Sequence, residues 1–155
     1  MTVVIQRVHT ETQCLDVRAM VEAHVRFERS DVAIPDDWAA RTARSIGSGR
    51  LKMLVAVADG ATVGYASISR EHSTWTAAPF AHLDCLFVDA DHRGEGVGVL
   101  LFDAVAREAG AMGLSQLQWQ TPEWNTRAAE FYSALGGRAQ QKLRFSLILE
   151  PTPTT

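Results

Sequence analysis

The sequence has two cysteines, no long apolar run and no strong excess of either charge, and each shortage excludes a class of protein. Cys14 and Cys85 lie far apart and match no metal-ligand spacing, so we expect buried thiols and no metal site. No apolar run reaches the roughly 20 residues that a membrane-spanning helix needs, which argues against a membrane protein. The N-terminus lacks a basic segment followed by an apolar one, so we expect no secretory signal and a cytoplasmic location.

Length and composition indicate one globular domain. The chain has 155 residues, of which 46% are hydrophobic and 21% charged. We expect the domain to span residues 1–150 and to be followed by a disordered tail, 151–155. The net charge of −3 argues against nucleic acid as a partner and is compatible with a cationic substrate.

The first half of the chain predicts a strand, two helices and a hairpin. Residues 3–8 are typical of a short strand, and a capping box opens a helix over residues 10–27. A second helix is expected over residues 35–47. Two β-rich runs in residues 52–70 flank Asp59-Gly60, a pair that favours hairpin turns.

The second half predicts alternating strands and helices. The strands are expected at residues 81–88, 115–121 and, as one or two final strands, 138–149; the helices are expected at residues 98–112 and 126–135. Together the elements predict a single α/β domain. Its mixed sheet would have six to seven strands flanked by four helices, with the antiparallel hairpin first and the crossover helices later.

A glycine-rich segment, "RGEGVG" (Arg93–Gly98), joins the predicted strand 81–88 to the next helix. Glycines at such a junction serve either a tight turn or the approach of an anion to bare backbone. The Walker motif is excluded because Val99-Leu100 stand where it needs Lys-Ser/Thr, and Val99 also breaks the dinucleotide fingerprint. An anion site remains open, since a helix start presents unpaired N–H groups and Arg93 adds a cation.

The same six residues carry a family resemblance. "RGEGVG" resembles the Arg/Gln-x-x-Gly-x-Gly/Ala signature of the GCN5-related N-acetyltransferases, and the predicted order of elements is also similar to that family's order. "LDCLFVDADHRGEGVG" followed by "PEWNTRAAEFYSALGG" looks most like the spermidine/spermine and thialysine (diamine) acetyltransferase branch.

The resemblance implies a binding site for acetyl-CoA as co-substrate. In such enzymes loop amides hold the pyrophosphate, the central strand pairs with pantetheine, and one strand N–H polarises the thioester carbonyl. The residues so implied are Leu86 (the carbonyl donor), Phe87, Val88, Arg93, Gly94, Glu95, Gly96, Val97, Gly98, Val99, Asn125 and Tyr132. Asn125 is also a good N-cap for the helix that follows it, and the two roles are compatible.

The resemblance also implies two groups that move protons. Tyr132 matches the family's general acid, which protonates the departing thiolate; the alternative is a core tyrosine. Asp84 matches a carboxylate, usually Glu, that helps to deprotonate the amine, a step needed because an amine with a pKa of about 10.4 is almost wholly ammonium at neutral pH. Strict alternation places Asp84 on the strand face opposite Leu83, Cys85 and Phe87. His82 and His72 are alternative proton acceptors.

Acidic residues near the end of the first helix are candidates for contact with the amine. Glu28 is the strongest of them, and Asp84 is a second; the alternative for such acids is a solvated surface. Cys85 is not favoured as an acyl-carrying nucleophile, because no His-Cys activation pattern is visible.

The resemblance therefore implies an enzyme that moves an acetyl group from acetyl-CoA to a primary amine of a small molecule by direct attack. Two alternatives stay open: acetylation of a protein N-terminus or lysine, and a non-catalytic acyl-CoA-binding module. The family is commonly dimeric, so a homodimer is expected, with the final strands able to pair across subunits.

Overall fold

The computed structural model describes residues 1–151, which fall into two compact units, Met1–Gln120 and the chain from Thr121 onward. In the first unit the elements are β1 (Val3–Arg7), α1 (Glu11–Phe27), α2 (Trp38–Gly47), β2 (Lys52–Ala58), β3 (Ala61–Ser73), β4 (Ala78–Val88), the 3₁₀ turn η1 (Ala90–His92), α3 (Val97–Ala111) and β5 (Leu117–Gln118). The second unit contains α4 (Thr126–Ala134).

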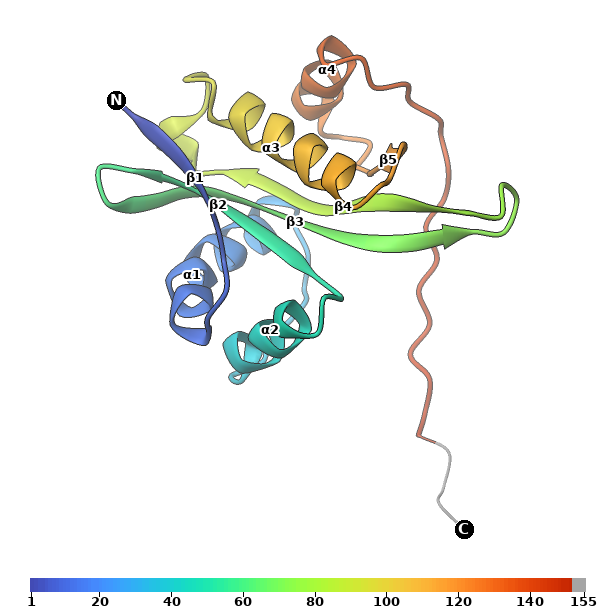
Figure 1. Cartoon of the computed structure of the whole chain (residues 1–155), viewed down its shortest axis with the longest axis horizontal. Helices are drawn as coiled ribbons and strands as arrows, with labels where there is room; N and C mark the ends of the chain where they lie inside the picture. Colours follow the sequence, from blue (N-terminus) through green and yellow to red (C-terminus); the bar gives the residue numbers. More distant parts are fainter. Residues whose placement is uncertain (152–155) are drawn as a thin grey trace. The chain divides into compact units, whose positions relative to one another are not determined.

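One mixed sheet organises the first unit, with its strands in the order β1-β2-β3-β4-β5 (Figure 1). The first four strands are antiparallel neighbours, and β5 is parallel to β4. Helices α1 and α2 lie on one face of the sheet and α3 lies on the other (Figure 1). The predicted mixed sheet, with its antiparallel hairpin first, is therefore confirmed.

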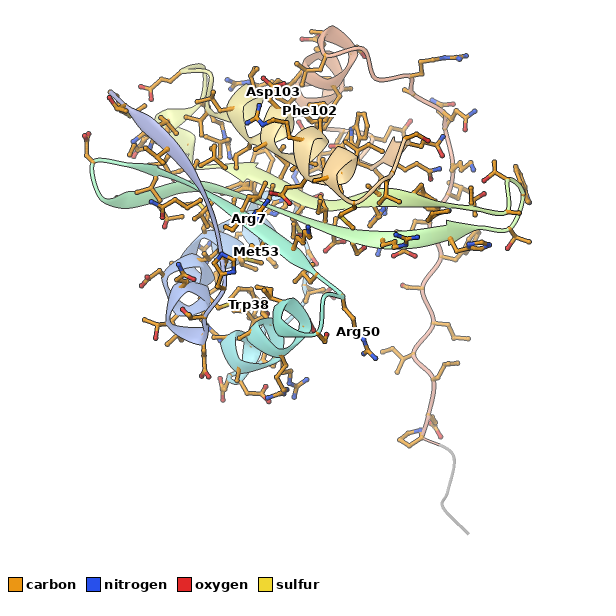
Figure 2. The ribbon with its side chains drawn as sticks, in the orientation of Figure 1. Arg7, Trp38, Arg50, Met53, Phe102 and Asp103 are labelled. Carbon is orange, nitrogen blue, oxygen red and sulfur yellow. The ribbon has the colours of Figure 1, made fainter. Side chains whose placement is uncertain are left out.

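Each face of the sheet has its own hydrophobic core, because alternate residues of a strand point to opposite sides. On the α3 side the buried residues include Leu54, Ala56, Ala66, Ile68, Leu83, Val88, Val97, Leu101 and Val105. On the α1/α2 side they include Cys14, Val17, Ala39, Met53, Val55, Tyr65 and Phe87. Figure 2 shows Met53 and Trp38 on the α1/α2 side and Phe102 with α3.

Local signals set the ends of several elements as predicted. The Thr10 hydroxyl accepts a bond from the Gln13 N–H, and the Gln13 side chain accepts one from the Thr10 N–H, which completes the capping box of α1. Asp59 and Gly60 both have positive φ (51° and 79°), as a tight two-residue hairpin turn between β2 and β3 requires.

A bulge in β4 corrects the predicted alternation of its side chains. Ser67 on β3 is opposite Cys85 and Ile68 is opposite Leu83, so Asp84 is an extra residue in the described ladder. Leu83 consequently faces the α3 side while Cys85 and Phe87 face the α1/α2 side. The expectation that Leu83, Cys85 and Phe87 share one face was wrong, because an inserted residue reverses the alternation beyond it.

Helix α3 is fixed to the sheet by a buried carboxylate and a bare glycine. Glu108 pairs with Arg7 on β1 (2.6 Å) and Lys52 on β2 (3.2 Å). Burial raises the Glu108 pKa, but the bonds from these two cations outweigh it and hold the pKa below its ordinary value. Gly64 on β3 leaves room for the Leu101 side chain, which would lie 3.1 Å from a Cβ at that position.

The expected strand count is not confirmed. The sheet of the described chain has five strands, and residues 138–151 form neither helix nor strand. A strand needs a partner for its backbone groups, and the fold of a single chain supplies none for this segment among the residues described. Its apolar side chains are 80–94% exposed: Leu143, Phe145, Leu147, Ile148 and Leu149.

Two further expectations concerned the C-terminal tail and the number of domains. The predicted tail, 151–155, lies outside the described residues except for Pro151, and the proposed single domain over residues 1–150 stays a prediction. Within residues 1–151 we find no helix with the length and apolarity needed to cross a bilayer.

Gly64→Ala should destabilise the fold by about 1–3 kcal/mol, the usual effect of overpacking a core. The added Cβ would lie 2.9 Å from the Phe87 carbonyl oxygen, and a backbone atom of the central strand cannot move aside cheaply. Urea unfolding measures the change. Gly110→Ala in α3 is the matched control, since its Cβ meets nothing within 4 Å and it should stabilise by up to about 1 kcal/mol. Equal stability of Gly64→Ala and wild type would contradict this account.

Candidate active site

The glycine-rich segment lies between β4 and α3, as predicted. Gly94 and Gly96 have φ of 81° and 84°, a left-handed conformation that side-chain-bearing residues rarely adopt. Gly96 is the N-cap of α3, and no side chain of the described residues caps that end. The first-turn N–H groups of α3, at Val97, Gly98 and Val99, therefore have no intrahelical acceptor and carry the positive end of the helix dipole.

Arg93 is directed back toward the sheet. Its Nε donates to the Val88 carbonyl at 2.9 Å, and its guanidinium carbon lies 4.5 Å from the centroid of the Phe27 ring and 5.2 Å from that of Phe87. These contacts tie the start of the loop to β4 and to the end of α1. Its role as a phosphate ligand stays a prediction.

The edge of β4 is open beyond its first half. Strand β5 pairs with β4 only at Ala81 and His82 in the described ladder, so Leu86, Phe87 and Val88 continue past the paired section. Phe87 and Val88 are buried and Leu86 is half-buried. An unpaired strand edge that runs toward a loop of free amides can accept an extended polar ligand.

Asp84 stands at the bulge, and its side chain is 60% exposed. One carboxylate oxygen lies 3.7 Å from His82 Nε2, and the other accepts a weak bond from the Cys85 thiol at 3.7 Å. The bulge thus presents a carboxylate to solvent beside a histidine. His72 is exposed on β3.

Glu28 ends α1 and is bonded to a residue of its own helix. Its Oε2 lies 2.8 Å from His24 Nε2, at i,i+4 spacing, and His24 Nδ1 lies 2.6 Å from the Tyr65 hydroxyl on β3. The imidazole also stacks on Phe87, with ring centroids 4.8 Å apart. The structure therefore joins a predicted substrate residue, Glu28, to the α1/α2 face of the central strands.

Two groups of this face keep their protons at neutral pH. Burial, with the neighbouring Asp84 charge, raises the pKa of the Cys85 thiol to about 12. Burial, with the neighbouring Cys85, raises the pKa of Tyr65 well above its ordinary value. A thiol with such a pKa is a poor nucleophile, which agrees with the low expectation for Cys85 in acyl transfer.

Asn125 and Tyr132 belong to the second unit. The Asn125 side chain caps α4, since its Oδ1 accepts a bond from the Ala128 N–H at 3.2 Å. Tyr132 is half-buried on α4, and its ring centroid lies 5.2 Å from that of Phe131. The capping role is confirmed, while the contacts of both residues with a ligand stay predictions.

Comparison with known proteins identifies the family. Residues 17–136 match the model of the acetyltransferase (GNAT) family. The chain belongs to the acetyltransferase (GNAT) family. The resemblance drawn from "RGEGVG" is thus confirmed, over a segment that includes the second part of α1, the central strands, the glycine loop and α4.

Relatives within the GNAT family include thialysine N-epsilon-acetyltransferases. The chain is 36% identical to the Bos taurus protein over 76 residues, which are 49% of this chain and 44% of that protein. It is 27% identical to the Mus musculus protein over 137 residues, covering 83% and 80% of the two chains. The alignment with the Bos taurus protein therefore spans less than half of that protein's length.

Solved structures confirm the GNAT fold. The aminoglycoside N-acetyltransferase AAC(6')-Iy in complex with CoA superposes with a TM-score of 0.80, at 23% identity and with 95% of each chain covered.

Sequence reasoning missed His24, which is bonded to the predicted substrate residue Glu28, and Tyr65, which is bonded to His24. The spacing of His24 and Glu28 is that of neighbours on one helix face, and this signal was available in the sequence. Tyr65 carried no comparable signal, because it occupies an ordinary inward position of a strand and its partner comes from a distant helix.

Proposed function

We propose that this protein is an acetyl-CoA-dependent N-acetyltransferase that acts on a primary amine of a small molecule. One observation carries the proposal: the unpaired section of β4 leads directly into a loop whose first helical amides have no intrahelical acceptor. Membership of the GNAT family and the relatives that acetylate thialysine support it.

The loop and the strand edge would hold the co-substrate. The amides of Gly94 to Val99 suit a diphosphate, since they combine N–H donors with the dipole of α3. The backbone of Leu86 to Val88 would pair with the extended pantetheine arm, and the Leu86 N–H would donate to the thioester carbonyl. Such a donor typically accelerates acyl transfer by about 100- to 1000-fold.

Asp84 would receive a proton from the incoming amine. An ammonium ion is not nucleophilic, so a proton acceptor is needed beside the thioester at neutral pH. The bulge exposes the Asp84 carboxylate two residues from Leu86 on the same strand. Bulges beside active sites commonly direct a side chain in this way.

Tyr132 and Asn125 would complete the reaction from the second unit. The Tyr132 phenol would protonate the departing thiolate, and the Asn125 amide would bond to the pantetheine arm while it caps α4. Direct attack of the amine on the thioester forms the amide bond and breaks the carbon–sulfur bond, so no acyl-enzyme is required.

The acceptor class follows from charge. Glu28 and Asp84 are carboxylates on elements that meet the α1/α2 face of the sheet, and they suit an acceptor with a second positive charge. A polyamine, a basic amino acid or an amine-bearing antibiotic has that chemistry.

The active form would be a homodimer. Five apolar side chains of residues 143–149 are 80–94% exposed in the single chain, and the pairing of that segment with a second copy would cover them.

Calorimetry should detect coenzyme A binding to the wild type at millimolar concentration or below. Gly96→Ala should weaken this binding by about tenfold or more, because a side chain at φ 84° strains the backbone by about 1–2 kcal/mol and displaces the amides that follow. Gly60→Ala is the matched control: its φ is 79°, it also has open space around it, and it lies in the β2–β3 turn. Absence of heat with the wild type would refute the proposal.

Thiol release from acetyl-CoA with an amine panel tests the acceptor class. We expect turnover with polyamines, basic amino acids or aminoglycosides, and little with peptides that carry only a lysine or a free N-terminus. Turnover confined to the peptides would favour the protein acetyltransferase instead. Tight coenzyme A binding with no release for any amine would favour the binding module.

Tyr132→Phe should lower turnover by about 100-fold or more, the usual contribution of a general acid, with little change in acetyl-CoA affinity. Steady-state kinetics and calorimetry on the same preparation measure the two effects. A collapse of affinity with turnover preserved at saturation would instead make Tyr132 a packing or pantetheine contact.

A further inference from the structure

We propose that His24 is a positioning residue for the acceptor, because it holds the Glu28 carboxylate in the direction that binds the acceptor's second positive charge. This inference rests on the proposed function, in which Glu28 contacts the acceptor, and it adds the group that makes this contact selective. Its basis is a set of bonds and ring contacts that join His24 on α1 to Glu28, to Tyr65 on β3 and to Phe87 on β4.

Glu28 occupies a position that local electrostatics disfavour. It is the C-cap residue of α1, where the helix dipole presents its negative end and favours cations. The chain turns away immediately afterwards, since Arg29 has a φ of 59°. A residue that breaks a local rule of this kind is commonly functional, and the Glu28 side chain is 35% exposed, enough to contact a ligand.

A hydrogen bond from His24 directs the Glu28 carboxylate. Glu28 Oε2 lies 2.8 Å from His24 Nε2, and because a carboxylate only accepts hydrogen bonds, the imidazole carries a hydrogen on Nε2. A long side chain otherwise samples several rotamers, and a ligand that needs one of them must order it on binding. The bond from His24 therefore supplies part of this ordering before the acceptor binds.

The other nitrogen of the imidazole is held by the sheet. Nδ1 lies 2.6 Å from the Tyr65 hydroxyl, which donates to a neutral ring and accepts from an imidazolium. Nε2 carries a hydrogen in both of these forms, so the bond to Glu28 does not depend on the charge of the ring. The His24 side chain is only 12% exposed, so water competes little for either bond.

The imidazole lies on two paired strand residues. Tyr65 and Phe87 are directly opposite each other in the β3–β4 ladder, and both are buried. His24 stacks on Phe87, with ring centroids 4.8 Å apart and planes inclined by 22°, and it meets Tyr65 edge-on at 5.7 Å. The direction of Glu28 is thus set by the central strands as well as by α1, which packs on this face of the sheet (Figure 1).

The same contacts connect the carboxylate to the proposed donor site. Phe87 belongs to the section of β4, Leu86 to Val88, that would pair with the pantetheine arm. One strand would then carry the thioester along its edge and, through the Phe87 ring, support the imidazole that directs Glu28. The non-reacting ammonium of the acceptor would be kept at a constant distance from the thioester, so that its other amine is aimed at the carbonyl carbon. An acceptor with one positive charge has no group to place at Glu28.

Steady-state kinetics with matched acceptors test this inference. The probes are a series of α,ω-diaminoalkanes and the alkylamines of equal length, which lack the second charge. For the wild type, the best diaminoalkane should have a KM at least about tenfold below that of its alkylamine, the contribution of one charged hydrogen bond. His24→Leu removes both bonds of the imidazole and should raise the diaminoalkane KM by about fivefold, the effect of ordering one long side chain on binding. Its kcat and its alkylamine KM should change by less than about twofold, because the lost interaction serves binding and not the chemical step.

A conservative variant separates positioning from packing. His24→Gln provides an amide that donates to Glu28 and accepts from Tyr65, and it should keep the diaminoalkane KM within about twofold of the wild-type value. His9→Leu changes an exposed histidine before α1 and should leave both series unchanged. Equal KM values for His24→Leu and His24→Gln would contradict the positioning role.

A double-mutant cycle shows whether His24 acts through Glu28. Glu28→Gln removes the charge and should abolish the preference for diaminoalkanes over alkylamines. In that background His24→Leu should cause no further rise in KM, because the group that it directs has lost its charge. A further rise of about fivefold would show instead that His24 acts by packing alone.

A measurement on the wild type does not depend on the variants being folded. In nitrogen NMR of the complex with coenzyme A, a diaminoalkane should shift the hydrogen-bearing Nε2 signal of His24, assigned by its loss in His24→Gln. The alkylamine of equal length should not shift it, and an identical response to both amines would overturn the inference. Failure of the proposed function looks different, because the wild type would then release no thiol from acetyl-CoA with any amine. Failure of this inference alone leaves turnover intact, with equal KM values for the two series of amines.

Discussion

The extra residue in β4 determines most of what this site can do. With Asp84 inserted opposite β3, the alternation of the β4 side chains reverses inside the strand, before it reaches Leu86, Phe87 and Val88. Leu83 packs under α3, whereas Cys85 and Phe87 pack under α1. A bulge weakens the ladder locally, and the fold keeps this one because both cores are built around the reversed order. Removal of the insertion would turn Cys85 and Phe87 toward the α3 side of the sheet.

The sequence was informative wherever a short-range rule applied. The capping box of α1, the Asp59-Gly60 turn, the glycines with positive φ and the Asn125 cap are each decided by a few neighbouring residues, and the structure confirms them. The bulge was not predicted, because it is a property of two strands and their register and not of β4 alone. The prediction of a strand in residues 138–149 was also wrong. An alternating apolar pattern indicates that a segment is able to pair, but it does not show that the fold provides a partner strand.

The same division holds for the candidate site. The glycine-rich loop between β4 and α3 follows from local sequence, and it lies where the sequence predicted it, with α3 beginning at Val97. The contacts from Glu28 through His24 to Tyr65 join α1 to β3, so no window of sequence contains them. His24 and Tyr65 are also ordinary inward-facing residues when each is considered separately. Arg93 also has contacts that the sequence did not predict. It was expected beside an anion, and in the structure it donates to the Val88 carbonyl and lies over the rings of Phe27 and Phe87.

The five apolar side chains between Leu143 and Leu149 have a thermodynamic consequence. Full coverage of each side chain would contribute roughly 1.5–3 kcal/mol of transfer free energy, before the cost of ordering the segment is subtracted. Contact between two copies through this stretch would depend on the protein concentration, so the share of this apolar surface left in water would fall as the concentration rises.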